Sequence, residues 1–214
     1  MQIKYNITPR SSSIKYIVIH DTGNKSKGAD ARAHYNYFSG ENRNSSADCF
    51  IDSKEILWIN DYNKYYTWHC GDGKGKNGIT NNNSVGLELC VNTDSNYDKA
   101  FNNLIEETAR IAKKLNIKDA NIVRHFDASG KTCPASMLDN NWGKWKLFKN
   151  EVKKKMNELK FKDIEDHYAK KHIEKLLAYG IVNGDGTGNF NPNAPVTRAD
   201  AAIMVANALT YLGK

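Results

Sequence analysis

Two histidines and a cysteine with the chemistry of zinc ligands occur in the sequence, at His20, His125 and Cys133. His20 ends a short β-branched run and precedes Asp-Thr-Gly, so we expect it at the end of a strand, directed toward a cleft. His125 and Cys133 bracket a loop, HFDASGKTCP, that can fold back and place both on one ion. Two imidazoles and a thiolate suit Zn²⁺ and leave a fourth position for water, as in catalytic zinc sites. Spacing alone is weak support, because His20 lies far upstream and an isolated histidine is more often structural.

Alternating strand and helix patterns must position these side chains. Short apolar runs rich in β-branched residues predict strands at 16–19, 49–52, 56–59, 85–91 and 122–123. Helical spacing of apolar residues predicts helices at 29–38, at 98–115 and from about residue 142. This order of elements is typical of an α/β domain with a central mixed β-sheet flanked by helices.

The pattern changes after Phe161. Two helical segments, 168–179 and 197–212, flank a glycine-rich loop, and Thr197 followed by Asp200 resembles a capping box. The segment is therefore predicted to be a small all-α helix–loop–helix module of roughly 54 residues, a marginal size for independent folding. We expect one domain over residues 1–158 and a second over 159–214.

The net charge is unevenly distributed along the 214 residues. Lys and Arg number 31 against 24 Asp and Glu, which gives +7. Six basic and six acidic residues follow residue 160, so the excess, 25 against 18, belongs to the preceding part. An excess of positive charge favours polyanionic partners such as nucleic acid, anionic lipid or acidic wall polymer. Because there is no basic helix with interleaved aromatic residues, we do not expect a nucleic-acid partner.

Composition also restricts where such a chain acts. No segment approaches the ~20 consecutive apolar residues of a membrane helix, and the N-terminal residues lack the apolar core of a secretion signal. We therefore expect synthesis in the cytoplasm without a signal peptide. Disulfides are not expected in a reducing compartment, and Cys49 and Cys90, in strand-like surroundings, are predicted to be buried.

Four motifs follow one another in a recognisable order: IVIHDTG, WHCGDG, SVGLELCVN and RHFDASGKTCP. Over about residues 14–148 the sequence resembles zinc-dependent N-acetylmuramoyl-L-alanine amidases, the T7-lysozyme-like group that includes phage endolysins and peptidoglycan recognition proteins. The resemblance implies peptidoglycan as substrate and Zn²⁺ bound by His20, His125 and Cys133. Non-catalytic recognition proteins of this superfamily tend to lack the third ligand, so Cys133 favours an enzyme.

The same resemblance implies two catalytic side chains. Glu88 in GLELC matches the carboxylate that manages the proton of the attacking water, a general-base role. Lys131 matches a lysine that stabilises the tetrahedral oxyanion. The alternatives are an ordinary strand glutamate and an ordinary surface lysine.

Three further positions near these motifs have less defined roles. His69 in the WHCGDG segment is interpreted as a substrate-groove residue, with a structural role as the alternative. Asp48 stands where a histidine is common in relatives, which removes any substrate contact that such a histidine makes. His34 on the first helix is interpreted as a surface or packing residue.

Residues 161–209 resemble an S-layer homology domain, carried by FKDI, the GIVNGDGTGNFNPNAP loop and TRADAA. This resemblance implies binding of an anionic secondary cell-wall polymer. Arg198 is the expected polymer contact, since a guanidinium suits carboxylate or phosphate. The alternative is that Arg198 ties the start of its helix to the glycine loop.

Two other functions remain open at this point. One is a non-catalytic peptidoglycan-binding protein, and the other is a host autolysin with the same amidase activity instead of a phage endolysin. Whether the enzyme is a phage endolysin or a host autolysin, we expect it to act on the cell wall after release through holin lesions or lysis.

Overall fold

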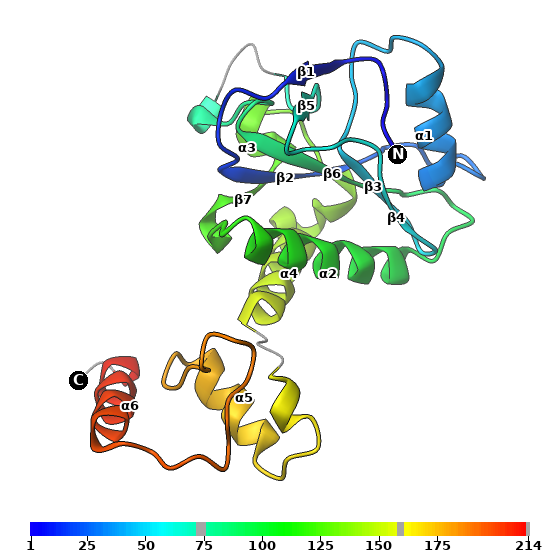
Figure 1. Ribbon diagram of the computed structural model, residues 1–214. Helices are drawn as coiled ribbons and strands as arrows, with labels where there is room; N and C mark the ends of the chain where they lie inside the picture. Colours follow the sequence, from blue (N-terminus) through cyan, green and yellow to red (C-terminus); the bar gives the residue numbers. More distant parts are fainter. Residues whose placement is uncertain (72–75, 158–160, 213–214) are drawn as a thin grey trace. The chain divides into compact units, whose positions relative to one another are not determined.

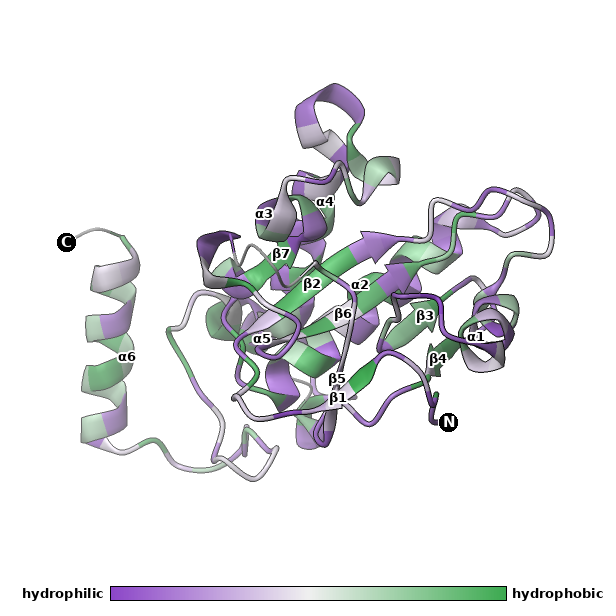
Figure 2. Ribbon diagram, turned by 90° about the horizontal axis from the view of Figure 1, so that it is seen from above, coloured by the Kyte–Doolittle hydropathy of each residue, from purple (hydrophilic) through white to green (hydrophobic). Residues whose placement is uncertain are grey.

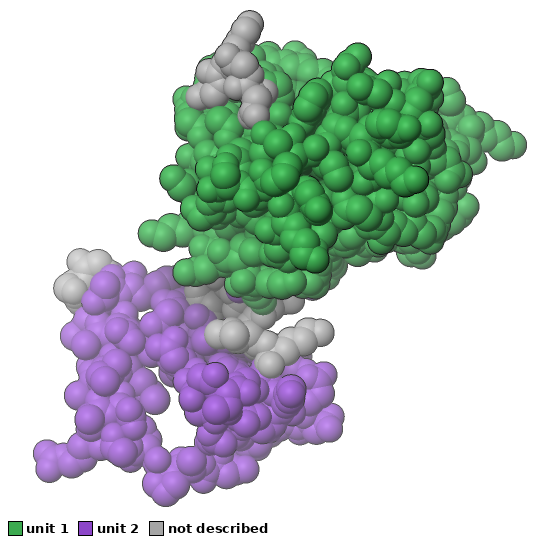
Figure 3. Space-filling view, turned by 45° about the horizontal axis from the view of Figure 1, so that its top comes forward, with its two compact units in different colours: residues 1–153 green, residues 154–214 purple. Residues whose placement is uncertain are grey.

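A computed structural model describes residues 1–71, 76–157 and 161–212. The chain forms two compact units, Met1–Lys153 and Lys154–Lys214, which are distinguished in Figure 3. The predicted domain boundary, between residues 158 and 159, lies outside the described residues. Across the part of the chain that the structure describes, every helix is too short or too polar to cross a membrane.

A five-stranded mixed sheet forms the centre of the first unit (Figure 1). Its strand order is β4-β3-β6-β2-β7, with β3, β6, β2 and β7 parallel and β4 antiparallel at one edge. The strands are β2 (Tyr16–Asp21), β3 (Cys49–Ile51), β4 (Ile56–Trp58), β6 (Ser84–Leu89) and β7 (Ile122–Arg124). The predicted α/β fold with a mixed sheet is therefore confirmed.

In the described residues, three helices contact this sheet: α1 (Ala31–Gly40), α2 (Tyr97–Lys114) and α3 (His125–Ser129). A fourth, α4 (Asp139–Asn157), begins in the first unit and packs on α2. Helix α2 lies along one face of the sheet and buries a stripe that includes Leu104 and Ile111 (Figure 1). Phe148 of α4 is fully buried and contacts the rings of Phe101 and Trp145.

Most strand residues are apolar, and β2 and β6 carry the polar His20 and Glu88 near their carboxyl ends. Ile17, Val18 and Ile19 of β2 are fully buried, and the hydrophobic colouring of this strand gives way to hydrophilic at its arrowhead in Figure 2. The carboxyl ends of parallel strands are the usual place for a site in an α/β sheet. His20 and Glu88 therefore lie together at the carboxyl-end edge of the sheet. Cys49 and Cys90 are both fully buried, as predicted.

The structure also contains a small second sheet and several short turns that the sequence did not predict. Strands β1 (Ile7–Pro9) and β5 (Tyr65–Thr67) pair antiparallel. Arg10 fixes this pair beside the main sheet, because its guanidinium donates to the carbonyls of Tyr62 and Ser84. The short 3₁₀ turns are η1 (Lys76–Gly78), η2 (Asp119–Asn121), η3 (Ala135–Met137) and η4 (Lys162–Ile164).

The second unit contains α5 (Lys170–Ala178) and α6 (Arg198–Tyr211). Its core is a cluster of five buried side chains: Phe161, Ile164, Ile173, Leu177 and Val182. The predicted capping box is present, since Thr197 accepts from the Asp200 amide while the Asp200 carboxylate accepts from the Thr197 amide. Helix α6 has no buried residue, and its partly buried Met204 packs against this cluster.

Candidate metal centre and groove

Strand register places His20 beside Glu88. The two residues are direct partners in the parallel pairing of β2 with β6, so their side chains leave the same face of the sheet. Glu88 Oε1 lies 3.9 Å from His20 Nδ1. Two positions earlier, Val18 pairs with Gly86 on that face. The histidine and the carboxylate are therefore held together by backbone pairing alone.

Local capping places His125 and Cys133 on the same face. His125 begins α3, directly after β7, and Arg124 with Asp127 caps this helix through backbone and side-chain hydrogen bonds. Gly130 ends the helix with φ of 86°, a left-handed conformation that suits glycine. The Phe126 amide then donates to the Cys133 carbonyl, which folds the loop back onto the helix as the spacing predicted.

The ligand atoms of His20, His125 and Cys133 all lie within 4.8 Å of one another, and all three residues are buried. His20 Nδ1 is 3.0 Å from His125 Nδ1 and 3.9 Å from Cys133 Sγ. These separations allow one ion to contact all three atoms. Within the described residues, this is the group of His, Cys, Asp and Glu side chains whose geometry suits a metal ion.

The shifted pKa values of His20, His125 and Cys133 are consistent with a site that binds a cation. Burial, with the positive Lys131 nearby, lowers the pKa of His125 to about 4, and burial holds the pKa of His20 well below its ordinary value. Both imidazoles are therefore neutral, the form that binds metal. Burial and the neighbouring Glu88 raise the pKa of the Cys133 thiol to about 12. A thiolate in this position requires a bound cation to stabilise it.

Glu88 has one oxygen without a hydrogen-bond partner. Its Oε2 is buried and accepts from no group that the structure describes. Burial, and to a smaller extent the Asp21 carboxylate, raises the pKa of Glu88 to about 8. A buried acceptor of this kind is costly unless something binds it. A metal ion with its water would supply that interaction, so the donor set and this oxygen both fit a metal site.

A continuous groove crosses the cluster. A pocket of about 220 Å³ contains His20, Glu88 and Cys133 in its lining. It shares Trp68, His69 and Lys131 with a neighbouring pocket of about 530 Å³. On the other side it shares Thr22, His34 and Phe38 with a pocket of about 450 Å³. The central pocket thus adjoins two others, and these three pockets together form the groove.

The remaining predicted residues occupy distinct places. Lys131 is exposed at the wall of the groove. His69 also lines the groove, but its ring is buried, and its Nδ1 lies 3.0 Å from His20 Nε2. Asp72 and Gly73 of the WHCGDG motif lie outside the described residues. Asp48 is fully buried and its carboxylate accepts from the Gly86 amide and from Asn60, so it has no access to the groove.

His34 packs against the core as predicted and also lines the groove, a position that the sequence prediction missed. Its ring stacks on Phe50 with centroids 5.0 Å apart, and its Nδ1 lies 2.8 Å from the Asp30 carbonyl. Because that carbonyl can only accept, the His34 Nδ1 carries the proton. The signal in the sequence was the four-residue spacing from His34 to Phe38, which places both on the inner face of one helix.

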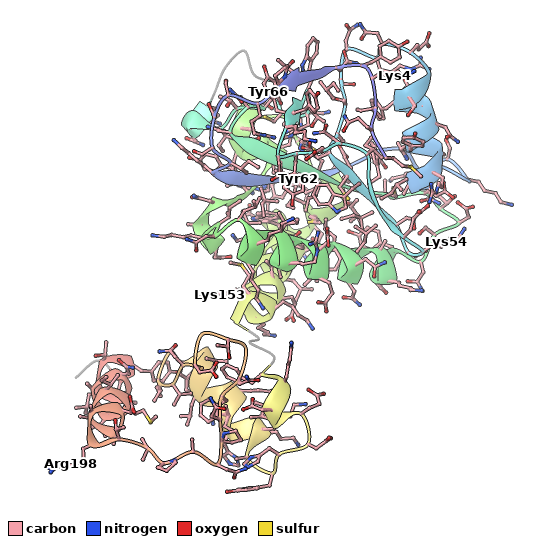
Figure 4. All side chains as sticks on the ribbon, in the orientation of Figure 1. Lys4, Lys54, Tyr62, Tyr66, Lys153 and Arg198 are labelled. Carbon is pink, nitrogen blue, oxygen red and sulfur yellow. The ribbon has the colours of Figure 1, made fainter. Side chains whose placement is uncertain are left out.

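Arg198 belongs to the second unit, at the start of α6. Its side chain is exposed and extends away from the helix in Figure 4. Among the residues that the structure describes, we find no hydrogen bond or ion pair to this guanidinium. Arg198 is therefore available to a ligand.

Comparison with known proteins identifies the family to which a chain with this fold belongs. Residues 10–136 match the family model described as N-acetylmuramoyl-L-alanine amidase, and the chain belongs to that family. Residues 160–202 match the S-layer homology domain.

Two curated relatives come from Bacillus subtilis (strain 168). The N-acetylmuramoyl-L-alanine amidase CwlH is 35% identical over 140 residues, which are 64% of this chain and 52% of CwlH. The amidase XlyA is 37% identical over 134 residues, 63% of this chain and 42% of XlyA. The chain therefore spans about half the length of the curated relatives it matches.

Solved structures agree with this assignment. The catalytic domain of XlyA superposes with a TM-score of 0.62 at 34% identity, covering 69% of this chain and 91% of that domain. PlyL superposes with a TM-score of 0.59 at 29% identity, covering 71% of this chain and 97% of PlyL. Both matches cover about the length of the first unit, so the amidase-like fold resides there.

Proposed function

We propose that the protein hydrolyses the amide between N-acetylmuramic acid and the L-alanine of the peptidoglycan stem peptide, with Zn²⁺ held by His20, His125 and Cys133. One observation carries the proposal: three buried ligand atoms lie within 4.8 Å beside a carboxylate on the adjacent strand. Three protein ligands leave a coordination position open, which is the arrangement of catalytic zinc. When bound, the metal polarises the scissile carbonyl and lowers the pKa of water.

Glu88 is proposed as the general base and acid. Its Oε2 is buried with no partner in the described residues, beside the ligand cluster. In this role the carboxylate accepts a proton from the attacking water and then donates it to the departing amine of L-alanine. Proton transfer by one positioned carboxylate contributes typically ~10²–10⁴-fold to a rate.

Lys131 is proposed to stabilise the oxyanion that develops on the scissile carbonyl. It lies in the lining of the groove pocket that also holds the ligands, and its positive charge lowers the pKa of His125. A cation whose field reaches the ligands also reaches charge that develops on a bound carbonyl.

The shape of the groove supports a polymeric substrate. Two further pockets share lining residues with the central pocket, which leaves room for an extended substrate beyond the scissile bond. Trp68 is 42% exposed and lines the larger pocket, where an aromatic face suits a sugar ring or a peptide. His69 remains a candidate for substrate contact through the edge of its ring.

The decisive experiment replaces Glu88 with glutamine. We expect Glu88→Gln to reduce hydrolysis of purified peptidoglycan by about 10²–10⁴-fold while zinc content stays at one ion per chain. Mass spectrometry of wild-type digests should show stem peptides with a free L-alanine amine. New reducing sugars in place of those peptides would identify a glycosidase and refute the proposal.

Glu107→Gln is a matched control, because Glu107 is also a buried glutamate but lies on α2 and accepts from Trp58 and Arg110. Its activity should stay near that of the wild type. If Glu88→Gln retained full activity, Glu88 would be removed from the mechanism. If the wild type bound zinc and cell walls without releasing peptides, the non-catalytic binding function would replace the hydrolase.

For the second unit we propose binding of an anionic cell-wall polymer through Arg198. The support is the match of residues 160–202 to the S-layer homology domain and the exposed, unpaired guanidinium in the described structure. The seven excess positive charges lie elsewhere, before residue 161. Specific anchoring then depends on a few side chains of the second unit, while the general attraction to an anionic wall comes from the first.

A further inference from the structure

A chain of hydrogen bonds leads from His20 to the protein backbone. His20 Nε2 lies 3.0 Å from His69 Nδ1, and His69 Nε2 lies 3.1 Å from Ser84 Oγ. Ser84 Oγ in turn lies 2.5 Å from the carbonyl oxygen of Thr80. His20, His69 and Ser84 are each at most 8% exposed, so water does not compete for these contacts.

The donor and acceptor of every hydrogen bond in this series follow from its last acceptor, the Thr80 carbonyl. A carbonyl oxygen only accepts, so the Ser84 hydroxyl donates to Thr80. With its own proton used, Ser84 Oγ faces His69 as an acceptor, and His69 carries its proton on Nε2. The His69 ring is buried with no carboxylate among its hydrogen-bond partners in the described residues, so it carries a single proton and its Nδ1 can only accept. His20 must then donate from Nε2.

We infer that the Thr80 carbonyl, acting through Ser84 and His69, fixes the tautomer of His20 so that its Nδ1 presents an unprotonated lone pair to the metal position. Ser84 and His69 are thus positioning residues for His20. The inference rests on the proposed metal site for its purpose, although the tautomer is a property of the chain alone. A ligand histidine held by its second nitrogen is fixed in orientation as well as in tautomer.

Packing holds the His69 ring in the required place. A Cβ atom at Gly86 would lie 2.7 Å from Cγ and from Nδ1 of His69, so the ring rests directly on the strand backbone. The amides of His69 and Cys70 both donate to Asn81 Oδ1, which fixes the backbone at this point. The Gly86 amide is itself bound by the Asp48 carboxylate. A glycine in the middle of a buried strand marks such a close approach.

This arrangement sharpens the interpretation of His69 drawn from the motif. Both ring nitrogens already have partners within the protein, at His20 and at Ser84. A substrate group could reach the ring edge in the groove only through carbon atoms, unless it displaced one of these partners. Substitution of His69 should therefore reduce the affinity for the metal more than it changes substrate recognition.

The first test measures the tautomers directly in the full chain after zinc removal by chelation. Long-range ¹H–¹⁵N correlation spectra of ¹⁵N-labelled protein distinguish a proton on Nε2 from one on Nδ1. We expect the Nε2-protonated form for both His20 and His69 in the wild type. In Ser84→Ala, both rings should become mixtures of tautomers. A wild-type His20 protonated on Nδ1 would overturn the inference.

The second test measures the dissociation constant for Zn²⁺ by competition with a chelating dye. We expect Ser84→Ala to weaken binding by about 10–100-fold, the usual effect of losing a partner of a metal ligand. Ser84→Thr keeps the hydroxyl and should recover most of the affinity. Equal affinity in the wild type and in Ser84→Ala would refute the positioning role.

Ser46→Ala is the matched control for this series. Ser46 is also buried, and its hydroxyl donates to the Asn6 carbonyl at 2.6 Å and accepts from the Trp68 amide. The variant loses a comparable hydrogen bond beside His69 without touching the ring, so zinc affinity should not change. If the wild type bound no zinc, the proposed function would fail, whereas the tautomer measurement would still decide the hydrogen-bond chain.

Discussion

In the first unit the polar groups that form the site are buried between strands, whereas in the second unit the main polar contacts lie on an exposed loop. His20, His69 and Asp48 are each at most 8% exposed. His20 and His69 are hydrogen-bonded to each other, and Asp48 accepts from the Gly86 amide of β6. In the second unit, the Asp185 carboxylate accepts from Thr187 and from the Asn189 amide in full contact with solvent.

This difference separates two ways of preparing a binding surface. Buried polar groups are costly unless they are partnered, so the hydrogen bonds that hold them make the site rigid and specific. Exposed loop contacts tolerate rearrangement at small cost, so the second unit can adapt to a ligand but gains little stability from them. The units should therefore respond very differently to the same kind of substitution.

The largest difference is expected for removal of a large apolar side chain. Phe148 is fully buried, and Phe148→Ala should lower the free energy of unfolding of the first unit by about 3–5 kcal/mol. All four tryptophans lie at or before residue 145, so their fluorescence reports on this unit during urea unfolding.

The counterpart in the second unit is Ile203→Ala. Ile203 lies on α6 and is 56% exposed, so its removal should change the unfolding free energy by less than about 0.5 kcal/mol. Amide hydrogen exchange of residues 198–211 measures this value. A loss of several kcal/mol would show that α6 is covered in solution and would remove the contrast between the units.

A smaller effect is expected for Arg198→Ala, in binding to purified cell walls. A charge-assisted hydrogen bond is worth about 1.5–3 kcal/mol, so sedimentation with walls should show an affinity about 10-fold lower or more. Arg198→Lys keeps the charge but not the planar fork and should recover only part of it. Arg32→Ala in the first unit, where Arg32 pairs with Glu55 on the surface, is the control. Equal loss in both alanine variants would indicate general electrostatic attraction.

The smallest effect is expected on acidification of the Asp185 loop. Hydrogen bonds from Thr187, Asn189 and Asn191 lower the pKa of Asp185 to about 2. A lowered pKa in the folded state stabilises the loop above the unfolded pKa of about 3.9, and this stabilisation disappears as the pH falls through the folded pKa. Amide exchange at Thr187 and Asn189 should therefore accelerate, relative to intrinsic rates, between pH 4 and about 2. Asp185→Asn should remove most of this pH dependence, and an identical profile in both proteins would contradict the assignment.

The sequence predicted the elements that have strong local signals. Short apolar runs located β2 and β6, and the apolar spacing of α2 matches its buried face. The predicted strands at β3 and β4 and the capping box of α6 also agree with the structure. These features depend on residues close together in the chain, where propensity and periodicity carry the information.

Other features depend on register between distant segments and left no local signal. Strands β1 and β5 have three residues each, and their pairing joins positions about 60 apart. The hydrogen bonds of His69 with His20 and Ser84 require the main sheet and the β5 segment to be in place first. Gly86 was the available clue, since a glycine within an apolar strand indicates that something packs on it.

The pairing of His20 with Glu88 also limits how this sequence can change in length. Side chains alternate across a strand, so one residue inserted or deleted between Ser84 and Glu88 would turn Glu88 to the opposite face. The carbonyl of Thr80 must also stay in reach of Ser84, four residues later. Among natural variants and in directed evolution, the span from 80 to 88 should therefore keep a constant number of residues.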